Sequence, residues 1–344
     1  MTNKAFYMTG IEKLELGEAP MPVVKPDGVI IKLKAVGICG SDLHYYTHGR
    51  IGDCIVEPPF ILGHECAGEV VEVGSEVTNL KVGDRVCMEP GVPCYKCDLC
   101  LEGKYNLCRS LHFWATPPDQ GCLCEYVAHP AAFTFKIPDN MSYVEGALVE
   151  PLAVGLHACN RANVKMGDTV AIIGAGCIGL VTLMSAKSMG ATKIIVGDMN
   201  EKRLAKAAEL GAITVNTEKE DYVKKVMELT GGHGADIVID CAGFTPTFKQ
   251  AVDAIKYGGV IVMVGLGGEK LNDLDNNLLS VKELDVRWVF RYRNVYPMAI
   301  NAVSSGIINL KSIVSHSFKF DETDVAYATC TKDIRNVVKG VIEY

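Results

Sequence analysis

Four cysteines lie within fifteen positions, 94–108, of a 344-residue chain that has fourteen cysteines in all. Four thiolates this close together can close a tetrahedron on a zinc ion, with Zn–S bonds of about 2.3 Å. Such a site has no open coordination position, so we expect the metal to hold the loop in shape without doing chemistry. An iron–sulfur cluster, or cysteines that merely share a loop, are the alternatives, and the charged residues between them favour zinc. The spacing is Cys94-x2-Cys97-x2-Cys100-x7-Cys108.

Three other segments, residues 36–49, 61–74 and 148–158, place possible metal ligands close to glycines. Their candidates are Cys39, His64, Glu65 and Glu150. Taken singly, the cysteine can be a small core residue and the histidine a hydrogen-bonded structural one. A glutamate before Pro151 can simply begin a helix. Residue types alone therefore leave both the structural and the catalytic interpretation open.

A glycine motif, Gly174-Ala-Gly176-Cys-Ile-Gly179, follows a strand-like run and opens a helical pattern. Asp198 ends the next strand-like run, as dinucleotide binding requires. The glycines let a pyrophosphate rest on amide N–H groups at the helix start, and the carboxylate accepts hydrogen bonds from ribose hydroxyls. A carboxylate disfavours a 2′-phosphate, so NAD is favoured over NADP, although the nearby Arg203 points the other way. The alternative is a glycine-rich turn in some other α/β protein.

The elements that must position these residues change character near residue 150. Before it, short strand-like runs at 29–34, 68–73 and 85–88 are separated by Gly and Pro, which predicts a β-rich half. After it, apolar strands alternate with amphipathic helices, and this alternation predicts a parallel sheet covered on both faces. The expected strands are 170–173, 193–196, 236–240 and 260–264, and the expected helices end at 189 or span 203–210, 222–229 and 248–255.

Composition narrows the functional classes. At 49% hydrophobic residues the chain is long enough for about two domains, and its net charge of −7 leaves no excess of Lys and Arg to neutralise phosphates. We therefore expect no nucleic-acid partner. Residues 1–10 lack a signal-peptide core, so a cytoplasmic location is expected. The uncharged stretch 169–186 has membrane-span length, but its three glycines and two threonines argue against insertion.

In this order, the segments resemble the zinc-dependent medium-chain dehydrogenase/reductase family over essentially the whole chain. The stretches 44–65, 113–140 and 289–300 are most similar to its polyol branch, the sorbitol dehydrogenases. The resemblance implies an α/β protein with a GroES-like β-rich catalytic domain, residues 1–152 and 288–344, around an inserted Rossmann domain, 153–287, with a doubly wound parallel sheet. It also implies an interdomain cleft and a homotetramer or homodimer. The general markers are Cys39-Gly-Ser-Asp-Leu-His44, Gly63-His-Glu65, the four cysteines, Glu150-Pro-Leu-Ala-Val154 and the glycine motif.

The resemblance makes Cys39, His64 and Glu65 ligands of a catalytic zinc. Glu150 stands where alcohol dehydrogenases have a second cysteine, and either contacts the metal through water or replaces Glu65. Such a zinc lowers the pKa of a bound alcohol, hydride passes to the nicotinamide, and reversal reduces a ketose. Two further residues occupy the positions of a proton relay, Ser41 and His44.

The expected activity is NAD-linked oxidation of a sorbitol- or xylitol-type polyol at C2, with one catalytic and one structural zinc per chain. Hydrogen-bond donors in the implied pocket suit adjacent hydroxyls better than an apolar alcohol. The rivals are a dehydrogenase for L-threonine or a vicinal diol, and a non-catalytic nucleotide-binding or zinc-sensing protein. The implied pocket comprises Tyr45, Phe113, Thr116, Arg291 and Tyr292; the cofactor site comprises Gly174, Gly176, Ile178, Gly179, Asp198, Arg203, Val264, Leu266 and Phe290.

Overall fold

The computed structural model describes residues 2–267, 270–272 and 274–344, and the chain divides into two compact units. The first unit comprises residues 1–150 and 296–344, and the second comprises 151–295. The boundaries expected from the sequence are 152 and 288. The structure therefore assigns residues 288–295, including Phe290, Arg291 and Tyr292, to the second unit.

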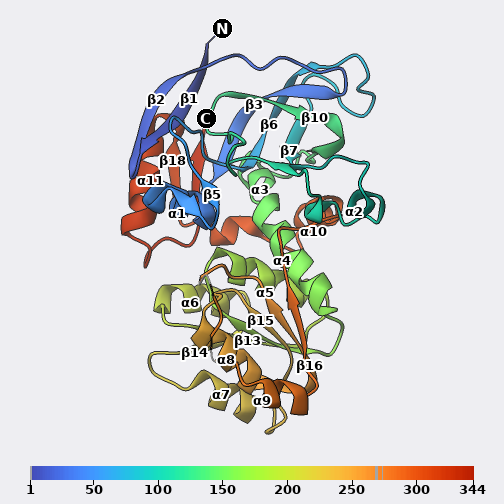
Figure 1. Cartoon of the computed structure of the whole chain (residues 1–344), viewed down its shortest axis with the longest axis vertical. Helices are drawn as coiled ribbons and strands as arrows, with labels where there is room; N and C mark the ends of the chain where they lie inside the picture. Colours follow the sequence, from blue (N-terminus) through green and yellow to red (C-terminus); the bar gives the residue numbers. More distant parts are fainter. Residues whose placement is uncertain (1, 268–269, 273) are drawn as a thin grey trace. The chain divides into compact units, whose positions relative to one another are not determined.

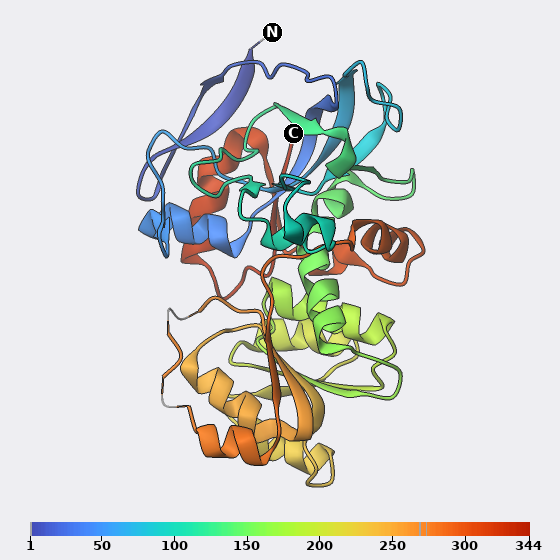
Figure 2. The same ribbon diagram turned by 45° about the vertical axis from the view of Figure 1, so that its right-hand side comes forward.

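A seven-stranded sheet forms the first unit, in the order β11-β7-β6-β3-β19-β18, with β10 also paired to β3. Strand β3 is long enough to hold two partners along one edge: its first half pairs with β10 and its last residues pair with β19. The C-terminal strand β19 thus pairs with β3, which comes from the N-terminal part of the chain (blue in Figures 1 and 2). Its sheet strands are β3 (Gly28–Gly37), β6 (Glu65–Val73), β7 (Arg85–Met88), β10 (Tyr126–Pro130), β11 (Thr134–Lys136), β18 (His316–Lys319) and β19 (Gly340–Glu343).

Smaller elements complete the first unit around a core that includes Ile31, Leu33, Leu62 and Tyr327. These side chains come from both chain segments of the unit, so burial of apolar surface joins the two segments. The remaining strands are β1 (Asn3–Gly10), β2 (Lys13–Ala19), β4 (Arg50–Ile51), β5 (Cys54–Ile55), β8 (Gly91–Val92) and β9 (His112–Phe113). The helices are α1 (Gly40–His48), α2 (Asp98–Leu101), α3 (Tyr143–Ala147), α10 (Tyr296–Ser304) and α11 (Thr323–Lys332), and α4 (Val149–Ala162) begins at the unit boundary.

A six-stranded parallel sheet forms the second unit, in the order β14-β13-β12-β15-β16-β17. This is the strand order of a Rossmann fold, which confirms the doubly wound sheet. Its strands are β12 (Thr169–Ile173), β13 (Lys193–Asp198), β14 (Ile213–Asn216), β15 (Ala235–Asp240), β16 (Ile255–Met263) and β17 (Asp285–Trp288). Its helices are α5 (Cys177–Ser188), α6 (Glu201–Glu209), α7 (Tyr222–Leu229), α8 (Thr245–Ala254) and α9 (Asn276–Val281).

The uncharged stretch 169–186 folds as β12 followed by most of α5. Within the described part of the chain, no helix combines the length and apolarity needed to cross a membrane. The strand predicted at 260–264 lies largely within β16, which starts earlier, at Ile255. The helix predicted at 248–255 is α8, which begins at Thr245 and ends one residue before β16.

Candidate active site

Cys39, His64 and Glu65 gather at the ends of two paired strands in the first unit. One ligand atom from each residue lies within 4.8 Å of the other two. Gly37 ends β3 and pairs with Glu65, which begins β6. A Cβ at Gly37 would lie 2.0 Å from Glu65 Oε2, so this position must be glycine for the carboxylate to fit. A thiol, an imidazole and a carboxylate in contact form a donor set suited to zinc, so these residues fit the ion.

Asp42 contacts the backbone or side chain of residues in and next to this cluster. Its side chain is fully buried on α1, where Oδ2 accepts a hydrogen bond from Cys39 N at 3.4 Å and Oδ1 accepts one from Gly63 N at 3.1 Å. The Asp42 Oδ1 atom also lies 3.3 Å from His64 Nδ1. Burial lowers the pKa of His64, but the Asp42 and Cys39 charges outweigh it and raise that pKa well above its usual value. A carboxylate at Nδ1 favours the proton there and leaves Nε2 for a metal.

Lys339 lies beside Glu65, although 274 positions separate them in the chain. Its Nζ is 2.6 Å from Oε1 and 2.5 Å from Oε2, and it also donates to the Ile38 carbonyl at 2.9 Å. Both side chains are almost fully buried, at 2% and 1% exposure. Lys339 was not predicted from the sequence as part of the site. A lysine within the apolar run 337–342 was the available signal, because a lysine buried among apolar residues requires a charged partner.

Glu150 lies in the first turn of α4 and is buried, at 5% exposure. Among the residues that the structure describes, Glu150 does not join the group of Cys39, His64 and Glu65, whose ligand atoms lie within 4.8 Å of one another. Its charge acts on another buried carboxyl, Glu89. Burial raises the pKa of Glu89 to about 8, the Tyr105 hydrogen bond opposes this shift, and Glu150 adds to it. That Glu150 contacts the metal through water, or replaces Glu65 as the direct ligand, stays a prediction.

The expected relay and pocket residues of the first unit lie at different distances from the cluster. The Ser41 hydroxyl donates to Cys39 Sγ at 3.3 Å, which places it at the candidate metal ligand. His44 is largely exposed and stacks on His48, with ring centroids 4.4 Å apart. Partial loss of solvent and the neighbouring His48 lower its pKa. The Phe113 ring centroid lies 5.6 Å from that of His64.

The other predicted pocket residues come from both units. Tyr45 is buried on α1, and Thr116 N donates to the Phe113 carbonyl at 3.1 Å. In the second unit, Arg291 adopts a positive φ of 55° and its guanidinium lies 4.8 Å from the Phe290 ring centroid. Tyr292 is buried, at 3% exposure. A role for these residues in substrate binding stays a prediction.

The four cysteines predicted to hold a structural metal form the second group of candidate ligands. Zinc–sulfur bonds of about 2.3 Å in a tetrahedron place the sulfurs about 3.8 Å apart. The observed Sγ–Sγ distances are 3.4 Å for Cys97–Cys100, 3.9 Å for Cys97–Cys108 and 4.0 Å for Cys94–Cys100. Backbone N–H groups of residues 96 and 97 lower the pKa of Cys94, whereas burial and the neighbouring thiols raise the pKa of Cys100. The sulfur separations therefore fit a metal ion held by four thiolates. We call residues 94–108 the four-cysteine lobe.

The glycine motif joins β12 to α5 in the second unit. Gly174 has φ 97°, and a Cβ at Gly179 would lie 1.9 Å from the Gly174 carbonyl oxygen, so both positions require glycine. Asp198 ends β13, and its carboxylate accepts hydrogen bonds from Ala175 N at 2.6 Å and Asn200 N at 2.8 Å. The acidic residue predicted to face the ribose is thus fixed against the glycine turn.

The other predicted cofactor residues lie near the glycine motif, just beyond a strand, or at exposed positions. An Arg203 guanidinium nitrogen lies 4.0 Å from the point where a Cβ of Gly176 would stand. Ile178 lies in the first turn of α5, and Val264 N donates to Asp240 O at 2.9 Å just beyond β16. Leu266 and Phe290 are exposed, at 83% and 53%.

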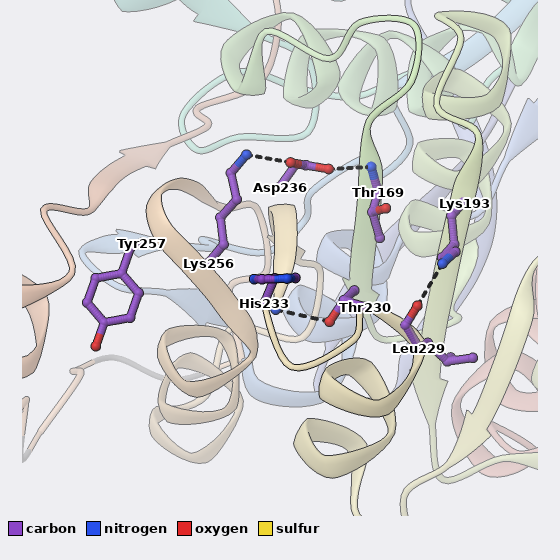
Figure 3. Close-up of a pocket in the computed structure, with 9 residues that line it drawn as sticks. Thr169, Lys193, Leu229, Thr230, His233, Asp236, Lys256 and Tyr257 are labelled. Atoms are coloured by element: carbon purple, nitrogen blue, oxygen red, sulfur yellow. Dashed lines mark hydrogen bonds and ion pairs between the residues drawn. The ribbon is translucent and has the colours of Figure 1, made fainter.

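A hollow of about 560 Å³ also opens in the second unit, lined by residues that include Thr169, Lys193, Asp236 and Lys256. Figure 3 shows that its cations already have partners: Lys256 Nζ lies 2.5 Å from Asp236 Oδ1, and Lys193 Nζ donates to the Leu229 carbonyl at 2.6 Å. Thr169 and Lys193 begin their strands, whereas ligands of such sheets bind beyond the strands' carboxyl ends. This hollow is therefore not the candidate active site.

Comparison with known proteins places both units. Residues 25–139 match the family model described as the alcohol dehydrogenase GroES-like domain, and residues 177–305 match that described as zinc-binding dehydrogenase. The chain is 44% identical to sorbitol dehydrogenase of Rattus norvegicus, covering 96% of this chain and 94% of that protein. It is 43% identical to L-idonate 5-dehydrogenase of Vitis vinifera, covering 95% and 90%. A crystal structure of an Escherichia coli oxidoreductase/dehydrogenase of unknown specificity superimposes with a TM-score of 0.96 at 45% identity, covering 100% and 99% of the two chains.

Proposed function

The chain belongs to the zinc-dependent medium-chain dehydrogenase family, with sorbitol dehydrogenases among its relatives, and from this premise we propose that it oxidises a polyol of the sorbitol or xylitol type at C2 with NAD. The observation that carries the proposal is the contact of Cys39, His64 and Glu65, whose ligand atoms lie within 4.8 Å of one another. These three residues would hold the catalytic zinc, with Glu150 as the alternative carboxylate. A zinc ion held there supplies a Lewis acid that lowers the pKa of a substrate hydroxyl.

The protein's own groups prepare that site. The Asp42 carboxylate lies 3.3 Å from the imidazole of His64 and accepts a hydrogen bond from the backbone of Cys39, so two ligands share one neighbour. The Ser41 hydroxyl, 3.3 Å from Cys39 Sγ, can take part in moving the proton that the substrate loses, with His44 as the second relay residue. The positive charge of Lys339 offsets the negative charge of Glu65, which allows this carboxylate to stay ionised although it is buried.

NAD is the proposed cofactor, and the Asp198 carboxylate supports it. Two backbone N–H groups hold this carboxylate at the glycine turn. From there it can accept hydrogen bonds from the ribose hydroxyls of NAD, and its charge would repel the 2′-phosphate of NADP. Arg203 lies near Gly176 and favours NADP by its charge. We propose that the Asp198 carboxylate decides the preference, and the ratio of kcat/KM values for the two cofactors tests this.

Two metal ions per chain and association of chains complete the proposal. The second zinc would occupy the four-cysteine lobe, whose sulfur separations support a closed tetrahedral site. An assembly of two or four chains is supported by β17, which ends the parallel sheet. Exposed apolar side chains follow this edge, with Trp288 at 58% and Phe290 at 53% exposure.

A substrate panel tests the activity. Initial rates of NADH formation are measured with sorbitol, xylitol, ethanol, L-threonine, L-idonate and 2,3-butanediol, before and after treatment with a zinc chelator. We expect the polyols to be far better substrates than ethanol, with the rates abolished by the chelator and restored by zinc. Preference for threonine, idonate or the diol would move the chain to another branch of the family. An absence of any NAD reduction by the zinc-loaded protein would favour a non-catalytic role.

A pair of variants sharpens this panel. Cys39→Ser removes the proposed thiolate ligand, whereas Cys54→Ser changes a half-buried cysteine outside both ligand groups. The first is expected to lose activity and one zinc ion per chain. The second is expected to keep both, which controls for general effects of removing a thiol.

A further inference from the structure

Tyr105 and Glu89 join the four-cysteine lobe to the sheet of the first unit. Tyr105 lies between the third and fourth cysteines, and its hydroxyl donates to Glu89 Oε1 at 2.9 Å. Glu89 directly follows β7 and is buried, at 3% exposure. A buried carboxyl needs polar partners, because losing one leaves an unmet desolvation cost. The lobe therefore supplies a partner that the sheet residue requires.

Aromatic packing holds the same two parts together. The rings of Tyr105 and Tyr95, both from the lobe, lie edge-on to Phe133, with centroids 5.5 Å and 5.8 Å away. Phe133 O accepts a hydrogen bond from Glu89 N at 2.9 Å. The lobe thus contacts Glu89 through a hydroxyl and through the residue that holds its backbone.

A short path leads from Glu89 to the metal-ligand cluster. Two residues after Glu89, Gly91 begins β8 and pairs with Phe113 of β9. The Phe113 ring lies 5.6 Å from that of His64. On the other side, the Glu89 carbonyl accepts a hydrogen bond from His129 Nε2 at 2.8 Å. A shift of Glu89 would therefore move the strand that places an aromatic ring against a metal ligand.

We propose that Glu89 is a positioning residue, and that its hydrogen bond with Tyr105 couples the four-cysteine lobe to the Cys39–His64–Glu65 cluster. The inference rests on the proposed function, because it concerns the same zinc site. It gives the lobe a role beyond holding its own loop: when the lobe is closed on its metal, Tyr105 is fixed and Glu89 is held in place.

The protonation state of Glu89 provides a spectroscopic readout of this contact. Burial raises its pKa to about 8, Tyr105 lowers it, and Glu150 raises it. The other titratable neighbours include His129, held neutral by a pKa lowered to about 4 through burial, Tyr95, and Cys87, whose thiol pKa is raised by burial. Glu89 is thus protonated at neutral pH, and its carbonyl stretch is visible in the infrared. Removing the Tyr105 hydroxyl should shift that band and raise the pH at which it disappears.

The experiment compares Tyr105→Phe with Tyr95→Phe, which removes a hydroxyl from the matching ring on Phe133. Glu89→Gln identifies the infrared band. The cluster is read out separately by placing cobalt(II) at Cys39, His64 and Glu65 while zinc stays in the lobe, because its visible spectrum reports ligand geometry. Metal content is measured for each protein.

We expect Tyr105→Phe to keep both metals, shift the infrared band, change the cobalt spectrum and lower kcat/KM by about tenfold, the lower end of the effect of losing an outer contact that orients metal ligands. Tyr95→Phe should leave the band and the cobalt spectrum unchanged. Equal spectra for the two variants would overturn the coupling. If Tyr105→Phe does not fold, Glu89→Gln takes its place, and an unchanged cobalt spectrum there has the same meaning. A cobalt change without polyol turnover in wild type would support the coupling and reject the proposed activity.

Discussion

Replacing Lys339 with methionine removes the positive charge that lies 2.5 Å and 2.6 Å from the two oxygens of Glu65. Removing one partner of a buried pair costs about 3–5 kcal/mol, because the other charge stays buried. The unpaired carboxylate can instead take up a proton, which costs about 3.7 kcal/mol at pH 7 for a glutamate with an ordinary pKa. The penalty therefore does not rise far above this value. The Ile38 carbonyl also loses a donor, worth about 1 kcal/mol. Lys339→Met should therefore destabilise the metal-free first unit by about 4 kcal/mol.

Zinc should remove most of this penalty. A divalent cation held by Cys39, His64 and Glu65 compensates the carboxylate, so the metal-loaded variant loses mainly the Ile38 hydrogen bond, about 1 kcal/mol. Linkage then requires zinc to bind the variant more tightly by the difference of about 3 kcal/mol, or roughly a hundredfold.

The assay is guanidinium unfolding with and without zinc, together with a competition titration of zinc affinity. The chain has two tryptophans, Trp114 in the first unit and Trp288 in the second, so a Trp288→Phe background lets fluorescence report the first unit alone. Lys136→Met is the control, because Lys136 pairs with Asp84 at 2.8 Å but is half exposed. Its loss should be about 1 kcal/mol or less, with or without zinc. Adding Glu65→Gln to Lys339→Met should restore much of the metal-free stability. An equal loss in both metal states, or weaker zinc binding, would refute the reasoning.

Three further predictions concern the lobe, the cofactor and acid stability. Cys97→Ser should lower the metal content from two ions to one per chain and reduce stability more than the turnover of the folded enzyme, as metal analysis and active-site titration would show; a folded, fully metallated but inactive variant would contradict this. Asp198→Asn should raise KM for NAD and bring the NAD and NADP efficiencies closer together while zinc content is unchanged, and an unaltered cofactor ratio would argue against the carboxylate's role. Burial lowers the pKa of His129 to about 4, so the unfolded state takes up a proton first as pH falls below about 6.5, and the unfolding free energy should drop by up to about 3 kcal/mol between pH 6.5 and 4. His129→Gln, which retains a donor for the Glu89 carbonyl, should flatten this dependence in unfolding experiments, and an equally steep loss in the variant would exclude His129 as its cause.

Local patterns were sufficient to predict most of the framework. The strand expected at 85–88 is β7, and the alternation after residue 150 became a parallel sheet in Rossmann order. These features depend on short-range periodicity and on glycines whose backbone conformations exclude other residues, as at Gly174 and Gly179. The domain boundary at residue 288 stays a prediction, since the segment after β17 has no periodic pattern that marks which unit it belongs to.

The side chains that set the electrostatics of the candidate site were largely missed. Asp42 lies inside a recognised marker segment, yet its contact with His64 depends on α1 meeting the start of β6. Lys339 reaches Glu65 across 274 positions, and Tyr105 reaches Glu89 across sixteen. Such pairs follow from tertiary packing, because burial and the identity of the partner are decided only once the strands are assembled.

Lys339 gives the candidate site a charge balance that neither the ligand set nor Asp42 provides. When zinc is bound and His64 is neutral, the Cys39 thiolate, Asp42 and Glu65 carry three negative charges and Lys339 one positive, so the group holds two negative charges that the zinc ion neutralises. Without the lysine, the loaded site would keep one uncompensated negative charge. That charge would hold zinc more tightly, but it would also oppose the loss of a proton from a substrate hydroxyl, because it disfavours further negative charge nearby. We therefore expect Lys339→Met to bind zinc more strongly and yet to turn over more slowly, with its optimum at higher pH. Faster turnover in this variant would mean that the lysine serves stability alone.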